Sequence, residues 1–258
     1  MKAATDPSFW DAMADDYEIK AHPFSLLFVE SMLEEIPLEP GTRLLDVATG
    51  TGAAAILAAE RGAEVVAIDF SEGMLERLRV KQLPGISALQ MDGQALDLED
   101  NSFDVTVSVF GVMLFEDWNK GLKEMARVTK QGGTTAVVTW SDPNGAGIRQ
   151  IIAPICGELF PDLELPPPPQ GMATLSDPEN LKRAMRSAGF NEPKVIRLSH
   201  RYHFTREAIF QGNPIRQRLS ESQQQKIVEV VKERFQDRRE GDSFYIESEA
   251  LLAIATKP

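Results

Sequence analysis

Hydrophobic positions along the chain follow a strand-like pattern in some segments and a helical period in others, and the two kinds of segment alternate. Largely apolar runs typical of buried strands occur at 42–48, 63–70, 86–91, 103–114 and 134–140. Amphipathic stretches typical of helices separate them at 52–62, 71–80 and 117–133, the last expected to stop at the glycines 132–133. Strands that alternate with helices predict an α/β fold with a doubly wound, mostly parallel sheet and right-handed crossovers.

The flanks of this alternating region add further elements. A helix over 6–17 is expected to begin at the Asp6-Pro7 pair and to place Phe9, Met13 and Tyr17 on one face, and a second helix covers 24–36. After 140 we expect helices at 144–160, 177–190, 206–212 and 221–236, an extended proline run at 166–169, and strands at 193–204 and 243–256. We therefore predict one domain over 1–258, a Rossmann-like seven-stranded sheet, and helical lid insertions at about 1–36, 144–172 and 206–240.

Composition narrows the class of protein. The 258 residues carry 39 acidic and 27 basic side chains, a formal net charge of −12, which disfavours a nucleic-acid partner because such partners are bound through Lys and Arg. Cys156, the one cysteine, permits no internal disulfide and is expected to be a small buried hydrophobe. No apolar run is long enough to span a bilayer, no signal peptide is evident, and no metal-ligand spacing is found. We expect a cytoplasmic, metal-free protein, with a homodimer left open.

The stretch LLDVATGTGAAA at 44–55 raises the question of a cofactor. Read as Gly50-x-Gly52-x-x-Ala55, it is close to the dinucleotide-binding fingerprint of nicotinamide enzymes. Asp69 ends the second predicted strand, 17 residues after Gly52, where a carboxylate can bind the two ribose hydroxyls of either class of cofactor. Asp46 ends the first strand, where it would attract an ammonium or sulfonium group and repel a pyrophosphate. Asp46 therefore favours a sulfonium cofactor, whereas Asp69 fits either class.

Successive segments of the chain resemble the class I S-adenosylmethionine-dependent methyltransferases, in the small-molecule subgroup of ubiquinone/menaquinone-type enzymes. The segments are LLDVATGTG, VVAIDFSEGML, MDGQALDLEDNSFDVTVSVFGVMLFEDW and GLKEMARVTKQGG, and the resemblance covers about residues 5–140. It implies a sheet whose last strand inserts antiparallel. Ala48 departs from the family's Gly-x-Gly-x-Gly pattern, and we expect it to be tolerated if its φ stays negative.

The resemblance also implies roles for individual residues. Asp46 and the backbone from Ala48 through Gly50 to Gly52 would hold the methionine part of S-adenosylmethionine, and Asp69 the ribose. The adenine would meet Phe70, Met74, Asp92, Gly93 and Gln94, the carbonyls near Val109 and Phe110 would meet the amino group, and Tyr17 would close over the methyl donor.

Methyl transfer from a sulfonium needs positioning above all, because the leaving group is already excellent. A general base is an option, and His200 and His203 near the carboxyl end of the sixth strand are the candidates, with Tyr17. Alternation along that strand places His200 with Leu198 and Tyr202, and His203 on the wetter face. The lid residues Ile148, Ile151, Ile152, Phe160 and Phe210 are candidates for an apolar pocket wall.

The sequence predicts an enzyme that methylates an O, N or C atom of a small, hydrophobic acceptor and releases S-adenosylhomocysteine. Two alternatives stay open at this point. One is a protein of this fold that binds S-adenosylmethionine without methyl transfer, and the other, less favoured, is an NAD-dependent oxidoreductase.

Overall fold

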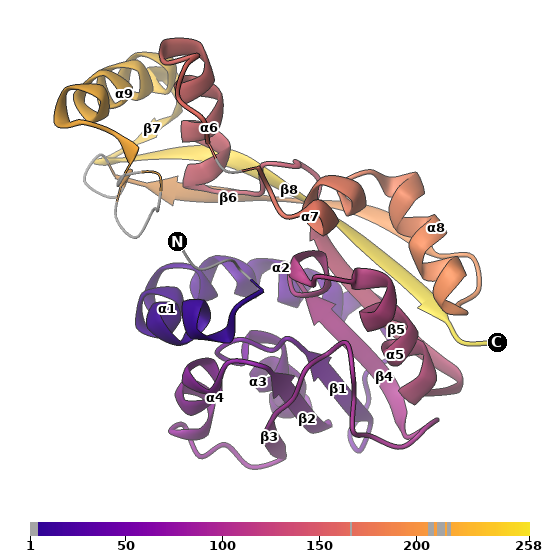
Figure 1. Ribbon diagram of the computed structural model, residues 1–258. Helices are drawn as coiled ribbons and strands as arrows, with labels where there is room; N and C mark the ends of the chain where they lie inside the picture. Colours follow the sequence, from indigo (N-terminus) through magenta and orange to yellow (C-terminus); the bar gives the residue numbers. More distant parts are fainter. Residues whose placement is uncertain (1–4, 166, 206–208, 211–214, 216–217) are drawn as a thin grey trace.

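A central mixed sheet organises the molecule (Figure 1). The computed structural model describes residues 5–165, 167–205, 209–210, 215 and 218–258. The strands run in the order β3-β2-β1-β4-β5-β8-β6, and the short β7 pairs with β8 beside this path. Their bounds are β1 (Arg43–Val47), β2 (Glu64–Asp69), β3 (Ile86–Gln90), β4 (Phe103–Val109), β5 (Thr129–Trp140), β6 (Lys194–Phe204), β7 (Arg239–Glu240) and β8 (Ser243–Thr256).

The sheet confirms the predicted topology. Strands β1 to β5 pair in parallel, and β8 inserts antiparallel between β5 and β6. The strand order reverses at β1, because β2 and β4 lie on its two sides. In such sheets ligands bind beyond the carboxyl ends of the strands at the point of reversal, so this arrangement fixes where a site belongs.

Helices cover both faces of the sheet. Helices α2 and α3 pack together on one side, and α5 and α8 on the opposite side (Figure 1). The helical bounds are α1 (Pro7–Lys20), α2 (His22–Glu35), α3 (Ala53–Glu60), α4 (Glu72–Arg79), α5 (Trp118–Val128), α6 (Ile148–Leu159), α7 (Gln170–Leu175), α8 (Pro178–Ala188) and α9 (Glu221–Arg234), with 3₁₀ turns η1 (Val112–Leu114) and η3 (Gln236–Arg238). Among the described helices, none is both long and apolar enough to cross a membrane.

Local side-chain chemistry explains where several helices begin. Asp6, Ser71, Asp117, Asp177 and Ser220 each accept a hydrogen bond from a backbone N–H in the first turn of the helix that follows. Such caps satisfy donors that would otherwise lack an intrahelical partner. The Asp6-Pro7 start that the sequence predicts is therefore confirmed.

Two predicted elements end earlier than expected. Helix α5 stops at Val128 rather than at the glycines, because the hydroxyl of Thr129 donates to the carbonyl of Met125 at 2.6 Å and the chain turns directly into β5. The glycines 132–133 lie inside β5, where Gly132 has a φ of +75°. Strand β4 ends at Val109, after which the chain forms η1. The helix expected at 206–212 lies largely outside the described residues.

The described hydrophobic residues form two separate cores. The larger one fills both faces of the sheet from β1 to β5 and includes Phe28, Leu45 and Met125. The second joins α6 and α9 to the outer halves of β6 and β8, and it buries Cys156 completely, as predicted for that residue. This second core forms the cap that stands away from the main sheet in Figure 1.

Gly111, just after β4, tests how tightly the ends of β1 and β4 pack. A Cβ at this position would lie 2.5 Å from the Cβ of Ala48 and 2.9 Å from the hydroxyl of Ser108. We expect Gly111→Ala to lower the free energy of unfolding by about 1–3 kcal/mol through overpacking, measured by urea denaturation. Adding Ala48→Gly should restore part of that loss.

Gly157 in α6 is the matched control for this pair of variants. A Cβ there would meet no atom within 4 Å. Gly157→Ala should therefore leave stability unchanged or raise it by up to about 1 kcal/mol, because alanine favours a helix. Equal losses at Gly111 and Gly157 would contradict the packing argument.

Candidate active site

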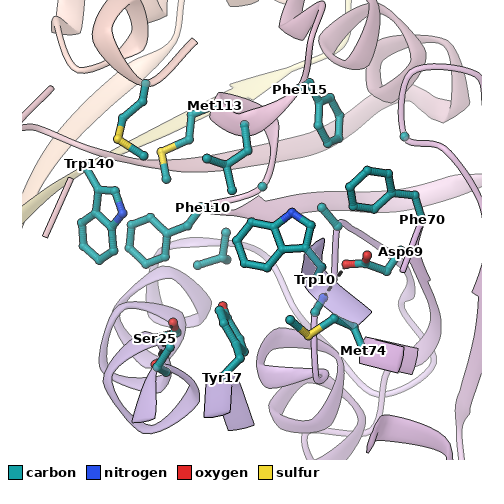
Figure 2. A pocket seen from close by; sticks show the side chains of 18 of the residues that line it. Trp10, Tyr17, Ser25, Asp69, Phe70, Met74, Phe110, Met113, Phe115 and Trp140 are labelled. Carbon is teal, nitrogen blue, oxygen red and sulfur yellow. Dashed lines mark hydrogen bonds between the residues drawn. The ribbon is translucent and has the colours of Figure 1, made fainter. Parts of the chain in front are cut away.

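A cavity of about 500 Å³ opens at the carboxyl ends of β1, β2, β4 and β5 (Figure 2). Its walls come from helices α1, α2 and α4, from the loops after these strands and after β3, and from β6 and α7 on the far side. The lining residues discussed below are Trp10, Tyr17, Lys20, Phe24, Ser25, Ala48, Gly50, Asp69, Phe70, Met74, Asp92, Gly93, Gln94, Val109, Phe110, Phe115, Glu116, Trp140, Met172 and Tyr202.

The glycine loop turns sharply by alternating into left-handed backbone. Ala48, Gly50 and Gly52 have φ values of +58°, +57° and +92°. The expectation that Ala48 keeps a negative φ is therefore wrong, and an alanine held in this region carries strain of about 1–2 kcal/mol. Ala48 and Gly50 line the cavity, whereas a Cβ on Gly52 would lie 2.4 Å from the side chain of Leu78. Gly52 thus lets α3 begin close to α4.

Asp46 lies beneath this loop and is almost fully buried. Its Oδ2 accepts hydrogen bonds from the hydroxyl of Thr49 at 2.6 Å and from the N–H of Ala55 at 3.1 Å. Burial raises the pKa of this carboxyl to about 7, although the two hydrogen bonds oppose the shift. Asp46 lines a small cavity of about 20 Å³ that shares Tyr17, Ala48 and Val109 with the large one.

Asp69, at the end of β2, faces the large cavity and is held rigidly. One carboxylate oxygen accepts from the N–H of Gly50 at 2.8 Å and the other from the N–H of Ser71 at 2.9 Å. Burial raises its pKa above the ordinary value, and these backbone donors offset part of that rise. Asp69 therefore ties the glycine loop to the start of α4.

Five further residues of the predicted cofactor set gather at one end of the cavity. Phe70, Met74, Asp92, Gly93 and Gln94 all line it. The Oδ1 of Asp92 accepts from the backbone N–H of Gln94 at 2.9 Å, and the side-chain oxygen of Gln94 accepts from the N–H of Asp117 at 2.8 Å. The sequence analysis missed Phe115, whose ring packs against Gly93 so closely that a Cβ there would lie 2.6 Å away.

Helix α1 closes this end of the cavity. The ring of Tyr17 lies over Gly50, with 3.5 Å between it and the position a Cβ would take. Burial raises the pKa of the Tyr17 hydroxyl, a hydrogen bond with Ser25 offsets part of the rise, and Asp69 and Asp46 add to it. The side chain that joins Tyr17 at the cavity is Trp10, one heptad earlier, rather than the predicted partners Phe9 and Met13.

The opposite end of the cavity is aromatic. Phe110 stacks on Trp140 with centroids 3.5 Å apart, and Phe24 packs near Trp140 and edge-on to Tyr202. Val109 and Phe110 were predicted as cofactor contacts, and both line the cavity. Phe24, Trp140 and Tyr202 were missed, although Trp140 ends the fifth predicted strand and so could have been found from the strand rule.

Neither predicted catalytic histidine lines the cavity. The Nε2 of His200 lies 3.0 Å from the hydroxyl of Ser31, and His203 lies on the exposed face of β6 with its Nε2 3.2 Å from Glu240. Their alternation along the strand is as predicted, but only Tyr202, between them, reaches the cavity. His22, at the start of α2, contacts the hydroxyl of Thr51 at 2.6 Å, and burial lowers its pKa.

The expected lid wall is also placed elsewhere. Ile151, Ile152, Phe160 and Phe210 pack in the second core and do not line the cavity, because α6 turns its apolar face toward α9. The side chain of Ile148 lies outside the description. Within the described residues, no cluster of His, Cys, Asp or Glu could hold a metal ion.

Comparison with known proteins agrees with this geometry. A family model described as a methyltransferase domain matches residues 45–137. A demethylmenaquinone methyltransferase of Staphylococcus saprophyticus is 32% identical over 178 residues, which cover 64% of this chain and 76% of that protein. The chain belongs to the class I S-adenosylmethionine-dependent methyltransferases. The predicted family is thus confirmed.

Other relatives of this methyltransferase match over a smaller share. A demethylmenaquinone methyltransferase of Corynebacterium efficiens is 34% identical over 59% of this chain and 64% of its own length, so the chain spans less than two thirds of that relative. The structure of Haemonchus contortus phosphoethanolamine N-methyltransferase 2, solved with S-adenosylhomocysteine, superposes with a TM-score of 0.56 at 20% identity over 89% of this chain and 52% of that one. That likeness establishes the shared fold.

The buried Asp46 of this methyltransferase predicts how stability depends on pH. In the unfolded chain an aspartate titrates near pH 4, whereas Asp46 in the folded protein titrates at about 7. Between these values the folded state keeps a proton that the unfolded state has released. The free energy of unfolding contributed by this group is therefore greatest below about pH 4, falls as pH rises to about 7, and then levels off.

Asp46→Asn should remove this slope without removing the hydrogen-bond acceptor. We expect the unfolding free energy of the ligand-free variant to fall less than that of the wild type between pH 4.5 and 7.5, measured by urea denaturation at several values of pH. The other titrating groups are common to both proteins and cancel in the difference. Parallel curves for the two proteins would contradict the raised pKa.

Proposed function

We propose that this methyltransferase transfers a methyl group from S-adenosylmethionine to a small, hydrophobic, ring-bearing acceptor of the quinol type. The observation that carries the proposal is one cavity with two unlike ends. The buried carboxylate of Asp69, fixed by backbone donors, lies at the end near β2 and β3, and stacked aromatic rings surround the end near β5 and β6. The demethylmenaquinone methyltransferases among the relatives support the quinol class.

The residues at the polar end fit an adenosyl cofactor. Asp69 presents a rigidly held carboxylate suited to ribose hydroxyls, and Gly93 has no side chain, so the ring of Phe115 packs directly against its backbone. We assign Phe70 and Met74 to the adenine faces, Asp92 and Gln94 to its edge, and the loop from Ala48 to Gly52 with Asp46 to the methionine part. Val109 and Phe110 would offer carbonyls to the amino group, and Tyr17 would cover the methyl donor.

Held by these residues, S-adenosylmethionine would supply an electrophilic methyl group on a sulfonium and would leave as the neutral thioether. The protein would orient the two reactants and exclude water, a contribution that reaches about 7–11 kcal/mol in favourable cases. Trp140, Phe24 and Tyr202 would hold the acceptor ring by stacking and edge contacts.

The acceptor itself would provide the nucleophile. Of the described residues that line the cavity, the carboxylates are Asp69, Asp92 and Glu116, all on the loops near β2, β3 and η1. The aromatic end offers the hydroxyl of Tyr202, whose pKa burial raises. An acceptor with an acidic ring hydroxyl would release its proton to solvent before it binds and would enter as the anion, so we assign His200 and His203 no catalytic role.

The net charge of −12 supports a small molecule rather than a nucleic acid as acceptor. We extend the proposal to a cytoplasmic protein in which α1 covers the bound cofactor. A homodimer stays compatible with this proposal. The alternatives of cofactor binding without transfer and of NAD-dependent oxidation are not favoured by the relatives.

Methyl-labelled S-adenosylmethionine tests this function directly. The purified protein is incubated with three acceptor pools, namely reduced demethylated quinones, RNA and protein. We expect label in the organic-extractable quinol product, identified by mass spectrometry. Label in RNA or protein would overturn the acceptor class, and S-adenosylhomocysteine binding without any labelled product would favour the non-methylating alternative.

Trp140→Leu tests the division of the cavity. Because Trp140 lies at the aromatic end, we expect the KM for the quinol to rise about tenfold, consistent with the loss of an aromatic contact of order 1 kcal/mol and buried ring area. The dissociation constant for S-adenosylhomocysteine should stay unchanged.

Trp118→Leu is the control, since Trp118 packs against the main core without lining the cavity. It should leave the KM for the quinol unchanged. A parallel loss of cofactor and acceptor affinity in Trp140→Leu would contradict the two-ended cavity.

A further inference from the structure

Three aromatic side chains, here called the waist, line the cavity where its two ends meet. Trp10, Tyr17 and Phe110 all line it, and Figure 2 shows Trp10 between Phe110 and the carboxylate of Asp69. The rings of Trp10 and Tyr17 meet edge-to-face, with centroids 6.2 Å apart and planes at 82°. The reactive sulfur of the cofactor would lie at this waist if the ribose is bound at Asp69 and the acceptor at Trp140.

Trp10 is held at this waist by its neighbour in the chain. The Oδ1 of Asp11 accepts hydrogen bonds from the hydroxyl of Ser71 at 2.6 Å and from the N–H of Gly73 at 2.9 Å, at the start of α4. Gly73 has no room for a side chain, because a Cβ would lie 2.8 Å from the Cα of Asp11. Since Ser71 also donates its N–H to Asp69, the indole and the ribose-binding carboxylate share one rigid support.

The charges around the waist are few. Asp69 faces it, Asp46 lies beneath the glycine loop, and Lys20 lines the same cavity with a positive charge. Asp46 already carries a pKa near neutrality, and the carboxylate oxygens of Asp69 already accept hydrogen bonds from backbone N–H groups. Aromatic faces add attraction for a cation without introducing another buried acid.

We propose that Trp10 determines specificity by favouring the cationic sulfonium of S-adenosylmethionine over the neutral thioether of S-adenosylhomocysteine at this waist. The inference rests on the proposed function. The quadrupole of an aromatic ring attracts a cation but gives no such attraction for a neutral thioether. Once the methyl group has been transferred, the cofactor has lost its charge and this attraction, so the product leaves more readily. Shape and hydrogen bonds are common to both ligands and cancel in the comparison.

Titration calorimetry on the full chain tests this role. Three ligands are used: S-adenosylmethionine, S-adenosylhomocysteine and sinefungin, an analogue with an ammonium group near the position of the sulfonium. For Trp10→Leu, which keeps apolar bulk, we expect the preference for the two cations over S-adenosylhomocysteine to fall roughly 3- to 30-fold. Trp10→Phe, which keeps an aromatic face, should retain most of the preference.

Phe9→Leu is the matched control. Phe9 lies on the same helix, and the centroid of its ring is 5.2 Å from that of Trp10, but Phe9 does not line the cavity. Its ligand preference should equal that of the wild type even if α1 is weakened. This control separates damage to the helix from loss of the ring face.

Two results would overturn the inference. Proportional losses for all three ligands in Trp10→Leu would make Trp10 a merely structural part of the lid, and an unchanged preference would leave the discrimination to the acids. Both results leave the proposed function standing. A wild-type protein that binds none of the three ligands would instead overturn the proposed function, and this inference with it.

Discussion

The whole site depends on the way two adjacent strands end. β1 and β4 pair in parallel, and each is followed by a residue other than glycine in left-handed backbone, Ala48 at +58° and Phe110 at +59°. The hydroxyl of Ser108 donates to the carbonyl of Val47 and so joins the two ends. Because the backbone turns away from the sheet at the same level after both strands, the crevice opens there. The strained backbone at Ala48 and Phe110 is tolerated because the surrounding core holds it in place.

The cofactor end places stability and function in conflict. Asp46 and Asp69 are both buried, and burying a carboxylate costs free energy unless hydrogen bonds compensate. Each accepts two hydrogen bonds, yet burial still raises the pKa of both carboxyls, that of Asp46 to about 7. A cationic ligand that binds beside these carboxylates can recover part of the free energy that their burial costs. This explains why buried acids, which are unfavourable for stability, occur at this point of the fold.

The sequence predicts the fold well because the fold repeats one unit, a strand followed by a helix, and each unit shows its own hydrophobic pattern. Strand β8 was predicted with its observed bounds, 243–256, and every expected cofactor residue except Asp46 and Gly52 lines the large cavity. At the aromatic end, Phe24 of α2 and Tyr202 of β6 were missed because they reach the cavity through tertiary packing alone, whereas Trp140 at the end of β5 was within reach of the strand rule. The apolar face of α6 was assigned to the pocket because periodicity shows that a face is buried, but not against which partner.

Some residues that line the cavity lie inside the segment matched by the family model and others lie outside it. This difference decides which part of the chemistry can be inferred from family membership. The cofactor-end residues from Asp46 to Gln94 all lie within the matched segment 45–137. Phe24, Trp140, Met172 and Tyr202 at the aromatic end lie outside it, on elements that flank the shared sheet. Membership therefore bears more strongly on the cofactor than on the acceptor. The acceptor must be argued from the aromatic packing of this chain, because fold alone does not carry substrate choice.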